Sequence, residues 1–315
     1  MERKKRTAVV RLLIGVALLA AALFAYAVEN LLPYYGIKPY RMAPAENRWR
    51  FPNGFTPEDY HLQAEKISVR TPDSLLLSGW FVKTNTDTVK GTVILLHGIS
   101  TCKETQFARA AILANAGYNS IALDLRAHGE SEGEFCTFGY YEKYDIKAVV
   151  DTVLHRTESA PVGIWGASLG GAIALQSMQV DPRIAFGIVE STFDEFEKVA
   201  IEYGADLMLG IKSEWLTRHV IGKSGNIAQF DPQSVKPVVS AAAIDRPILF
   251  MHGDRDDKIP IEFNRRNFEA VPSAQKQWIT VEGARHSDLW RRQGGRLRDS
   301  VQVFLHRMER AALPQ

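Results

Sequence analysis

From residue 64 onward, short apolar runs alternate with longer segments in which apolar residues recur at helical spacing. The runs predict strands at 66–70, 75–83, 92–96, 120–125, 162–165, 184–189, 247–251 and 278–281, the first two joined as a hairpin. The periodic segments predict helices at 104–116, 141–156, 170–180, 261–270 and about 295–311. Strands that alternate with helices predict an α/β fold, with a mainly parallel central sheet flanked by helices on both faces.

One interval does not follow this alternation. Between the strands at 184–189 and 247–251 the chain is about three times as long as a single crossover helix requires. Two stretches inside it, 193–209 and 214–220, have helical patterns. We therefore expect a small helical cap, at about residues 192–246, inserted before the strand at 247–251.

The N-terminal pattern is different again. Residues 12–28 form an uncharged apolar run of seventeen residues that follows a basic cluster. The run is close to the lower limit for a membrane-spanning helix (~17–25 residues) and longer than a typical signal-peptide core of ~7–15 residues. Tyr26, Tyr34 and Tyr35 lie near its far end, where interfacial aromatic residues are common. We expect residues 1–28 to be a signal-anchor, a retained transmembrane helix.

Two other interpretations of residues 1–28 stay open. Ala25-Tyr26-Ala27 fits the small-x-small pattern of a signal-peptide cleavage site, and cleavage near Ala27 would give a secreted or periplasmic protein. A buried core helix is the third interpretation. In both membrane interpretations the positive-inside rule keeps the basic N-terminus in the cytoplasm and leaves the rest of the chain on the extracytoplasmic side.

The segment between this helix and the α/β region is rich in proline. Residues 29–59 contain five prolines and no clear periodicity, which predicts a linker packed along the domain surface. The chain thus divides into an anchor (1–28), a Pro-rich linker (29–59) and one α/β domain (60–315).

Composition and charge exclude several classes of protein. Hydrophobic residues make up 46% of the chain and charged residues 23%, as in folded globular proteins, which excludes a disordered chain. Two cysteines are too few for a disulfide-dense scaffold or a multi-cysteine zinc cluster. The net charge of +2 combines +4 in residues 1–28 with −2 in the remainder, and an acidic body gives no reason to expect a nucleic-acid partner.

Gly166, Ser168 and Gly170 form a G-x-S-x-G motif between a predicted strand and a predicted helix. This context is that of a nucleophile elbow, a strained turn that exposes a serine at the C-terminal edge of a sheet. Ser168 is therefore the candidate nucleophile. The expected oxyanion donors are the backbone N–H of Leu169, which follows the serine, and that of Ile99, in the loop after the strand at 92–96.

An acyl-transfer serine also needs a base and an acid that orients this base. His286 follows the last predicted strand and so reaches the same sheet edge, which makes it the candidate base. Several carboxylates compete for the role of the acid: Asp254, Asp256 and Asp257 after one strand, and Glu190 and Asp194 one strand earlier.

These motifs resemble the serine-hydrolase branch of the α/β-hydrolase superfamily that includes monoglyceride-lipase-like and membrane-anchored esterase-like members. The resemblance covers residues 66–315 and rests on L-L-H-G at 95–98, D-L-R-A-H-G-E-S at 124–131, the G-x-S-x-G motif, H-G-D-R-D-D-K-I-P at 252–260, and His286. In that family the pattern H-G-x-x-D-x-x-V-P carries the acid at its fifth position, which implies Asp256; Ile259 in place of valine is the only departure. The resemblance also implies an α/β-hydrolase fold and a cap that shapes the acyl pocket.

We therefore expect a serine hydrolase that cleaves carboxylic esters, lipid esters or thioesters through an acyl-enzyme, with Ser168, Asp256 and His286 as the triad. Its partners would be a small-molecule or lipid ester substrate and the membrane. A peptidase or amidase of the same fold and a catalytically inactive binding protein are the alternatives. We expect no metal or organic cofactor, because the sequence has no H-E-x-x-H, no P-loop and no G-x-G-x-x-G after a strand. The oligomeric state is open.

The two cysteines raise a separate question. Cys102 and Cys136 follow neighbouring strands whose loops leave the sheet at the same edge. A disulfide between them and a pair of free thiols are both open, and an extracytoplasmic location would permit the bond.

Overall fold

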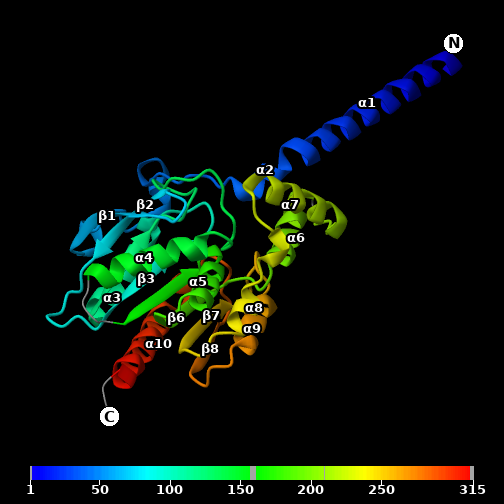
Figure 1. Cartoon of the computed structure of the whole chain (residues 1–315). Helices are drawn as coiled ribbons and strands as arrows, with labels where there is room; N and C mark the ends of the chain where they lie inside the picture. The colour runs from blue at the N-terminus through cyan, green and yellow to red at the C-terminus, as the bar shows by residue number, and fades with distance from the viewer. Residues whose placement is uncertain (1, 157–160, 209, 313–315) are drawn as a thin grey trace.

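The computed structural model describes residues 2–156, 161–208 and 210–312. Its strands are β1 (Ala64–Arg70), β2 (Leu76–Val82), β3 (Gly91–Leu96), β4 (Tyr118–Leu123), β5 (Val162–Ala167), β6 (Ile184–Glu190), β7 (Ile248–Gly253) and β8 (Lys276–Val281). Within the described residues they form one sheet in the order β1-β2-β4-β3-β5-β6-β7-β8 (Figure 1). The pairs β1–β2 and β2–β4 are antiparallel and the others are parallel, which confirms the predicted hairpin and the mainly parallel sheet.

Helices cover both faces of the sheet. One face carries α4 (Glu142–Arg156), α5 (Leu169–Val180), α8 (Pro237–Ala241) and α9 (Ile261–Ala270), and the other carries α3 (Phe107–Ala116) and α10 (Leu289–Ala312). Successive side chains of a strand point to opposite faces, so β3 contributes Ile94 and Leu96 to the first core and Val93 and Leu95 to the second. All residues of β3 and β4 are buried, as continuous apolar runs predict for central strands.

Between β6 and α8 the chain forms two further helices, α6 (Phe196–Leu207) and α7 (Glu214–Ala228). They pack on each other, and α7 also packs on the segment that follows the N-terminal helix (Figure 1). Both predicted helical stretches of this region are present, although Leu209, the end of the first, lies outside the described residues. We refer to α6 and α7 as the cap helices.

Two helix ends differ most from their predictions, and glycines lie at both. α7 extends eight residues beyond the predicted end at 220, because Gly225 lets the helix lie against the following turn: a Cβ there would be 2.6 Å from the carbonyl oxygen of Phe230. α10 begins six residues before the predicted start at 295, and a kink at Gln293 precedes Gly294 and Gly295. In the sequence these glycines suggest helix boundaries rather than helix interiors.

The N-terminal helix α1 (Glu2–Asn30) projects away from the sheet (Figure 1). The stretch from Lys5 to Ile37 is long and apolar enough to cross a membrane, and its most apolar window has none of its surface buried against the rest of the described chain. This exposure contradicts the interpretation of residues 1–28 as a buried core helix. A retained anchor and a cleaved signal peptide both remain compatible with such a helix.

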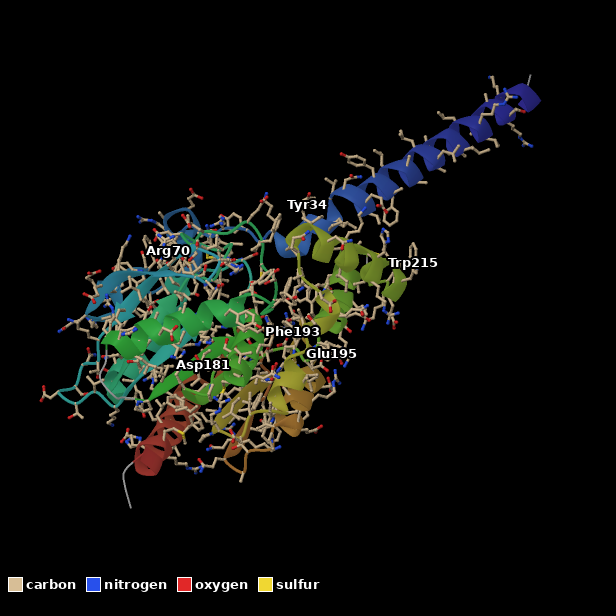
Figure 2. The ribbon with its side chains drawn as sticks, viewed as in Figure 1. Tyr34, Arg70, Asp181, Phe193, Glu195 and Trp215 are labelled. Carbon is tan, nitrogen blue, oxygen red and sulfur yellow. The ribbon has the colours of Figure 1, made fainter. Side chains whose placement is uncertain are left out.

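The Pro-rich segment after α1 is closely packed on the body of the molecule. It contains a short helix, α2 (Leu32–Ile37), a 3₁₀ segment at 44–50 that is kinked at Asn47, and a single 3₁₀ turn at 58–60. Ile37 and Met42 are buried, and the Arg41 guanidinium donates hydrogen bonds to three backbone carbonyls of the loop at 129–133. Figure 2 shows Tyr34 of α2 where α1 meets the body.

Candidate active site

A strained turn joins β5 to α5 at Ser168. This serine has φ 54° and ψ −118°, a conformation that non-glycine residues seldom adopt. The turn forms only because two glycines permit close backbone contact. A Cβ on Gly166 would lie 2.1 Å from the carbonyl oxygen of Gly170, and one on Gly170 would lie 2.4 Å from that of Leu96. The result is a nucleophile elbow, with Ser168 at the N-terminus of α5.

The structure brings Ser168, His286 and Asp256 together from three loops. Nε2 of His286 lies 3.1 Å from Oγ of Ser168, and Nδ1 of His286 lies 2.8 Å from Oδ2 of Asp256. A carboxylate only accepts hydrogen bonds, so in the neutral imidazole the proton sits on Nδ1 and Nε2 is left as an acceptor for the serine hydroxyl. This arrangement is able to take a proton from Ser168 as the serine attacks a carbonyl.

Asp256 is a buried carboxylate held in its ionised form. Its Oδ1 accepts hydrogen bonds from the backbone N–H groups of Lys258 and Ile259, both at 2.9 Å, and its Oδ2 also lies 3.2 Å from Nε2 of buried His252. Burial raises the pKa of Asp256, but the hydrogen bonds from His252 and His286 lower it by more, and the pKa lies well below its ordinary value. The role of His252 was not predicted from the sequence, although its position at the start of the H-G-x-x-D pattern is a signal for it.

None of the competing carboxylates forms a hydrogen bond to His286 among the described residues. Glu190 is buried and accepts hydrogen bonds from Arg109 and from two tryptophan indoles. Asp194 pairs with two basic side chains, Asp254 accepts a hydrogen bond from a backbone N–H, and Asp257 is exposed. Among the described His, Cys, Asp and Glu side chains, no group of three is arranged to hold a metal ion.

The two expected oxyanion donors lie near Ser168. Ile99 and Leu169 line the same cavity as the serine. Leu169 is the first residue of α5, where an N–H has no acceptor within the helix, and neither amide donates a hydrogen bond to another described residue. A Cβ on Gly98 would lie 3.5 Å from the Cβ of Ser168, so the turn before Ile99 packs against the serine. Both N–H groups are therefore available to an oxyanion formed at this serine.

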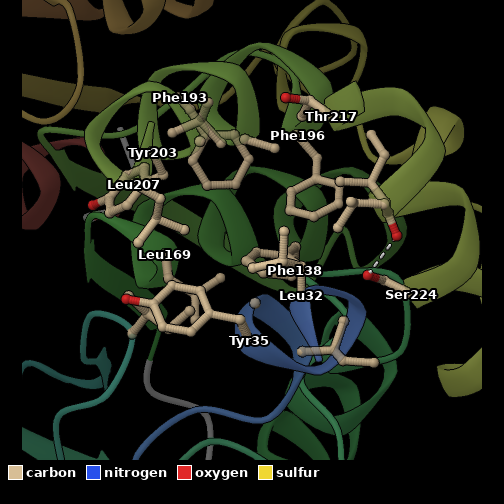
Figure 3. Close-up of a pocket in the computed structure, with 18 of the residues that line it drawn as sticks. Leu32, Tyr35, Phe138, Leu169, Phe193, Phe196, Tyr203, Leu207, Thr217 and Ser224 are labelled. Atoms are coloured by element: carbon tan, nitrogen blue, oxygen red, sulfur yellow. Dashed lines mark hydrogen bonds between the residues drawn. The ribbon is translucent and has the colours of Figure 1, made fainter. Parts of the chain in front are cut away.

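An apolar cavity of about 580 Å³ adjoins Ser168 (Figure 3). Its lining comes from the elbow, from the cap helices and from α2. Figure 3 shows Phe193 and Phe196 on one side of the cavity, and Leu32 and Tyr35 of α2 on the other. The volume is within the range of small-molecule sites (~300–1,000 Å³), and the side chains suit an acyl chain.

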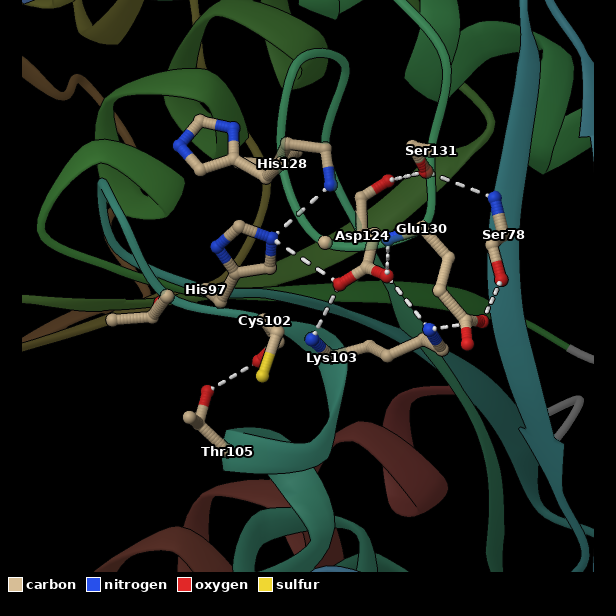
Figure 4. A network of polar contacts seen from close by, with 12 residues as sticks. Ser78, His97, Cys102, Lys103, Thr105, Asp124, His128, Glu130 and Ser131 are labelled. Carbon is tan, nitrogen blue, oxygen red and sulfur yellow. Dashed lines mark hydrogen bonds and ion pairs between the residues drawn. The ribbon is translucent and has the colours of Figure 1, made fainter. Parts of the chain in front are cut away.

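A buried polar network supports the turn that carries Ile99 (Figure 4). The backbone N–H of Leu125 donates to Nε2 of His97 at 3.1 Å, so the proton of His97 is on Nδ1 and is donated to the carbonyl of the next residue at 2.7 Å. Burial lowers the pKa of His97 to about 4 and that of the adjacent His128 to about 3, so both rings are neutral. Below them the buried Lys103 ammonium pairs with Asp124 at 2.7 Å.

Cys102 and Cys136 are free thiols in the structure, which contradicts the disulfide alternative. Cys102 packs with Met42 and Phe51, whereas Cys136 belongs to the larger core that contains Ile37. The shared sheet edge was not sufficient for a bond, because the two loops direct their cysteines into different clusters. Burial raises the pKa of each thiol, so neither is a reactive nucleophile.

The chain is similar to known hydrolases. Residues 87–224 match the family model described as serine aminopeptidase, S33. Monoglyceride lipase of Saccharomyces cerevisiae is 26% identical over 263 residues, which cover 66% of this chain and 81% of that protein. The YqkD protein of Bacillus subtilis is 26% identical over 225 residues, which cover 69% and 72% respectively. The structure of the esterase Pf2001 of Pyrococcus furiosus has a TM-score of 0.66 at 24% identity, covering 85% of this chain and 98% of that one.

Proposed function

Because the chain is a member of the α/β-hydrolase superfamily, we propose that it is a serine hydrolase that cleaves carboxylic esters, lipid esters and thioesters among them, through an acyl-enzyme. One observation carries the proposal. The side chains of Ser168, His286 and Asp256 are hydrogen-bonded in series beside an apolar cavity. Nucleophilic acyl transfer requires such a series of nucleophile, base and orienting acid.

The proposed mechanism has two halves. Ser168 Oγ attacks the ester carbonyl while Nε2 of His286 takes the hydroxyl proton, and the N–H groups of Ile99 and Leu169 stabilise the negative charge on the carbonyl oxygen. The protonated His286 then gives its proton to the departing alkoxide, which leaves as the alcohol, and Asp256 stabilises the imidazolium in between. Water attacks the acyl-enzyme by the same route, which releases the carboxylic acid and restores the serine hydroxyl.

The cavity favours an ester substrate over the amino terminus of a peptide. An aminopeptidase has to bind a cationic ammonium group beside the scissile bond, and a carboxylate is the usual counter-charge for it. Among the described residues that line the cavity, Lys38 is the only charged one, and it carries the wrong sign. Apolar side chains make up most of the remaining lining, which suits the acyl part of an ester.

Two readouts test the proposal: turnover of p-nitrophenyl butyrate, and covalent labelling by a fluorophosphonate probe. We expect Ser168→Ala to abolish both, whereas Ser234→Ala, at an exposed serine of the cap region, leaves both unchanged. A wild-type protein that is neither labelled nor active would support the alternative of an inactive binding protein. Faster turnover of an aminoacyl p-nitroanilide than of the ester would support a peptidase.

We also propose that residues 1–28 are a retained anchor, with the N-terminus in the cytoplasm and the hydrolase domain on the other side. The length and apolar character of α1 support a membrane span, and the basic cluster at its start supports this orientation. The mass of the mature protein distinguishes this from cleavage near Ala27. To test the orientation, protease is added to cells whose outer barrier has been permeabilised. If the hydrolase domain is not digested, the proposed orientation is wrong.

A further inference from the structure

The N-terminal apolar helix leads directly into a wall of the substrate cavity. The stretch able to cross a membrane runs from Lys5 to Ile37, and its last part, which forms α2, lines the cavity with Leu32, Tyr35 and Ile37. α2 begins only two residues after α1 ends. One wall of the cavity is therefore a direct continuation of the helix that we propose to lie in the bilayer.

Side-chain contacts hold the end of α1 and α2 against the cap helix α7. Glu29, in the last turn of α1, pairs with Lys223 and lies 2.7 Å from Nε2 of His219, both on α7. Ser224, on the same helix, donates a hydrogen bond of 2.7 Å to the backbone carbonyl of Pro33. These contacts join the end of the membrane stretch, α2 and α7 into one unit, so the cavity has a defined position next to the bilayer.

The exposed members of the lining indicate where the cavity opens. Tyr35 of α2 is 67% exposed and Leu207 at the end of α6 is 52% exposed, and both line the cavity (Figure 3). Ile211 and Trp215, farther along the cap region, are exposed as well. Figure 2 shows Trp215 at the end of the molecule from which α1 projects. Exposed aromatic and aliphatic side chains beside a membrane helix are of the kind that settles at a bilayer interface.

We propose that α1 and α2 are a delivery path as well as a tether: a lipid ester with a single acyl chain leaves the leaflet beside α1 and passes along α2 into the cavity, where its carbonyl meets Ser168. The proposal rests on the ester-hydrolase function proposed above. It follows from the direct continuation of α1 into α2, which lines the cavity. An acyl chain that follows this path stays in apolar surroundings. On a path through water, each methylene exposed would reduce the equilibrium constant for transfer about fourfold.

A linker insertion tests the delivery path. The full-length protein is reconstituted into phosphatidylcholine vesicles that contain monooleoylglycerol or lysophosphatidylcholine, and a flexible Gly-Ser linker of about ten residues is inserted after Leu31. We expect hydrolysis of both lipids in the same vesicle to fall at least tenfold, while turnover of soluble p-nitrophenyl butyrate changes less than twofold. The matched control is the same linker after Asp87, in an exposed loop, which should change neither rate.

The outcomes separate the two proposals. Unchanged lipid hydrolysis after the insertion at Leu31 would overturn the delivery path, even with ester turnover intact. If the wild-type protein hydrolyses only one of the two lipids, a tenfold fall for that lipid after the insertion would still support the path. A wild-type protein inactive on butyrate and on both lipids would instead refute the ester-hydrolase function itself.

A second variant tests α2 as the wall that limits acyl length. Leu32→Trp fills space inside the cavity, whereas Leu31→Trp places the same side chain at an exposed position one residue earlier that does not line the cavity. Over a series of p-nitrophenyl esters we expect Leu32→Trp to shift the optimum to shorter chains, with a loss of about fourfold in kcat/KM for each methylene that no longer fits. An unshifted optimum in Leu32→Trp would remove α2 from the binding site.

Discussion

Nδ1 of His286 lies 2.8 Å from Oδ2 of Asp256, and this contact determines which ring nitrogen faces Ser168. The Asp256 carboxylate can only accept hydrogen bonds, so it keeps the histidine proton on the side away from the serine. The orientation of the Asp256 carboxylate is in turn set by two backbone N–H groups and by His252.

Asp256→Asn should therefore reduce kcat by about 10⁴-fold, because the asparagine amide no longer enforces the tautomer that leaves Nε2 free. The fold should persist, since the side chain keeps its shape. Asp257→Asn changes the exposed neighbouring carboxylate and serves as the control, with kcat unaffected. Steady-state kinetics on p-nitrophenyl butyrate measure both variants, and equal losses in the two would refute the assignment of the acid.

For Glu190 we expect a loss of stability rather than of activity, because its carboxylate binds Arg109 and two indole N–H groups and not His286. Glu190→Gln breaks a buried ion pair and should lower the free energy of unfolding by about 3 kcal/mol, since Arg109 loses its counter-charge. The kcat of the folded enzyme should stay within about threefold of wild type. A large loss of kcat at unchanged stability would instead make Glu190 part of the catalytic apparatus.

Much of this fold follows from local patterns in the sequence. The continuous apolar runs that became β3 and β4 predict central strands, and the alternation of runs with periodic segments predicts the order of the layers. The errors at α7 and α10 both arise at glycines, but a close tertiary contact explains only the one in α7, since a Cβ on Gly294 or Gly295 of α10 would meet no other atom within 4 Å. Gly225 is required by close contact with a turn that lies outside the helix, and such tertiary requirements do not show in helix propensity.

Less of the candidate site could be predicted from the sequence. Motif context indicates Ser168 and His286, but spacing alone leaves several carboxylates as equal candidates for the acid, and only the family pattern selects one. The partner that occupies Glu190 is Arg109, 81 positions away in the sequence, and no local pattern reveals that pair. The contribution of α2 to the cavity was missed for the same reason, since its proline-rich context resembles a linker.

The cysteines allow a simple chemical test of the packing. Both thiols are buried and free, and burial raises the pKa of each. The native, unreduced protein should show no fast reaction with a disulfide reagent such as Ellman's reagent, because the thiolate is the reactive form. Denaturation without reductant should release two reactive thiols per chain. Detection of none after denaturation would mean that Cys102 and Cys136 are bonded and that the two clusters are packed differently.

The last prediction concerns pH and the two buried histidines beside the oxyanion turn, His97 and His128, whose rings are 5.0 Å apart. Burial is the main cause of their lowered pKa values, about 4 and about 3, against 6.5 as the ordinary value. Below pH 6.5 the unfolded chain therefore takes up protons that the folded chain does not. Each histidine should lower the free energy of unfolding by about 1.4 kcal/mol for every pH unit below 6.5, down to its folded-state pKa.

His128→Leu isolates one of these contributions, because Nε2 of His128 has no hydrogen-bond partner among the described residues and the ring is fully buried. Between pH 7 and pH 5 the variant should lose about 2 kcal/mol less stability than wild type, since other titrating groups are common to both proteins and cancel in the difference. Urea unfolding in detergent micelles at the two pH values measures this. His306→Leu, at an exposed histidine of α10, is the control and should lose as much stability as wild type between the two pH values. If His128→Leu also lost as much as wild type, His128 would take up its proton in the folded protein as well as in the unfolded chain, which would contradict the prediction.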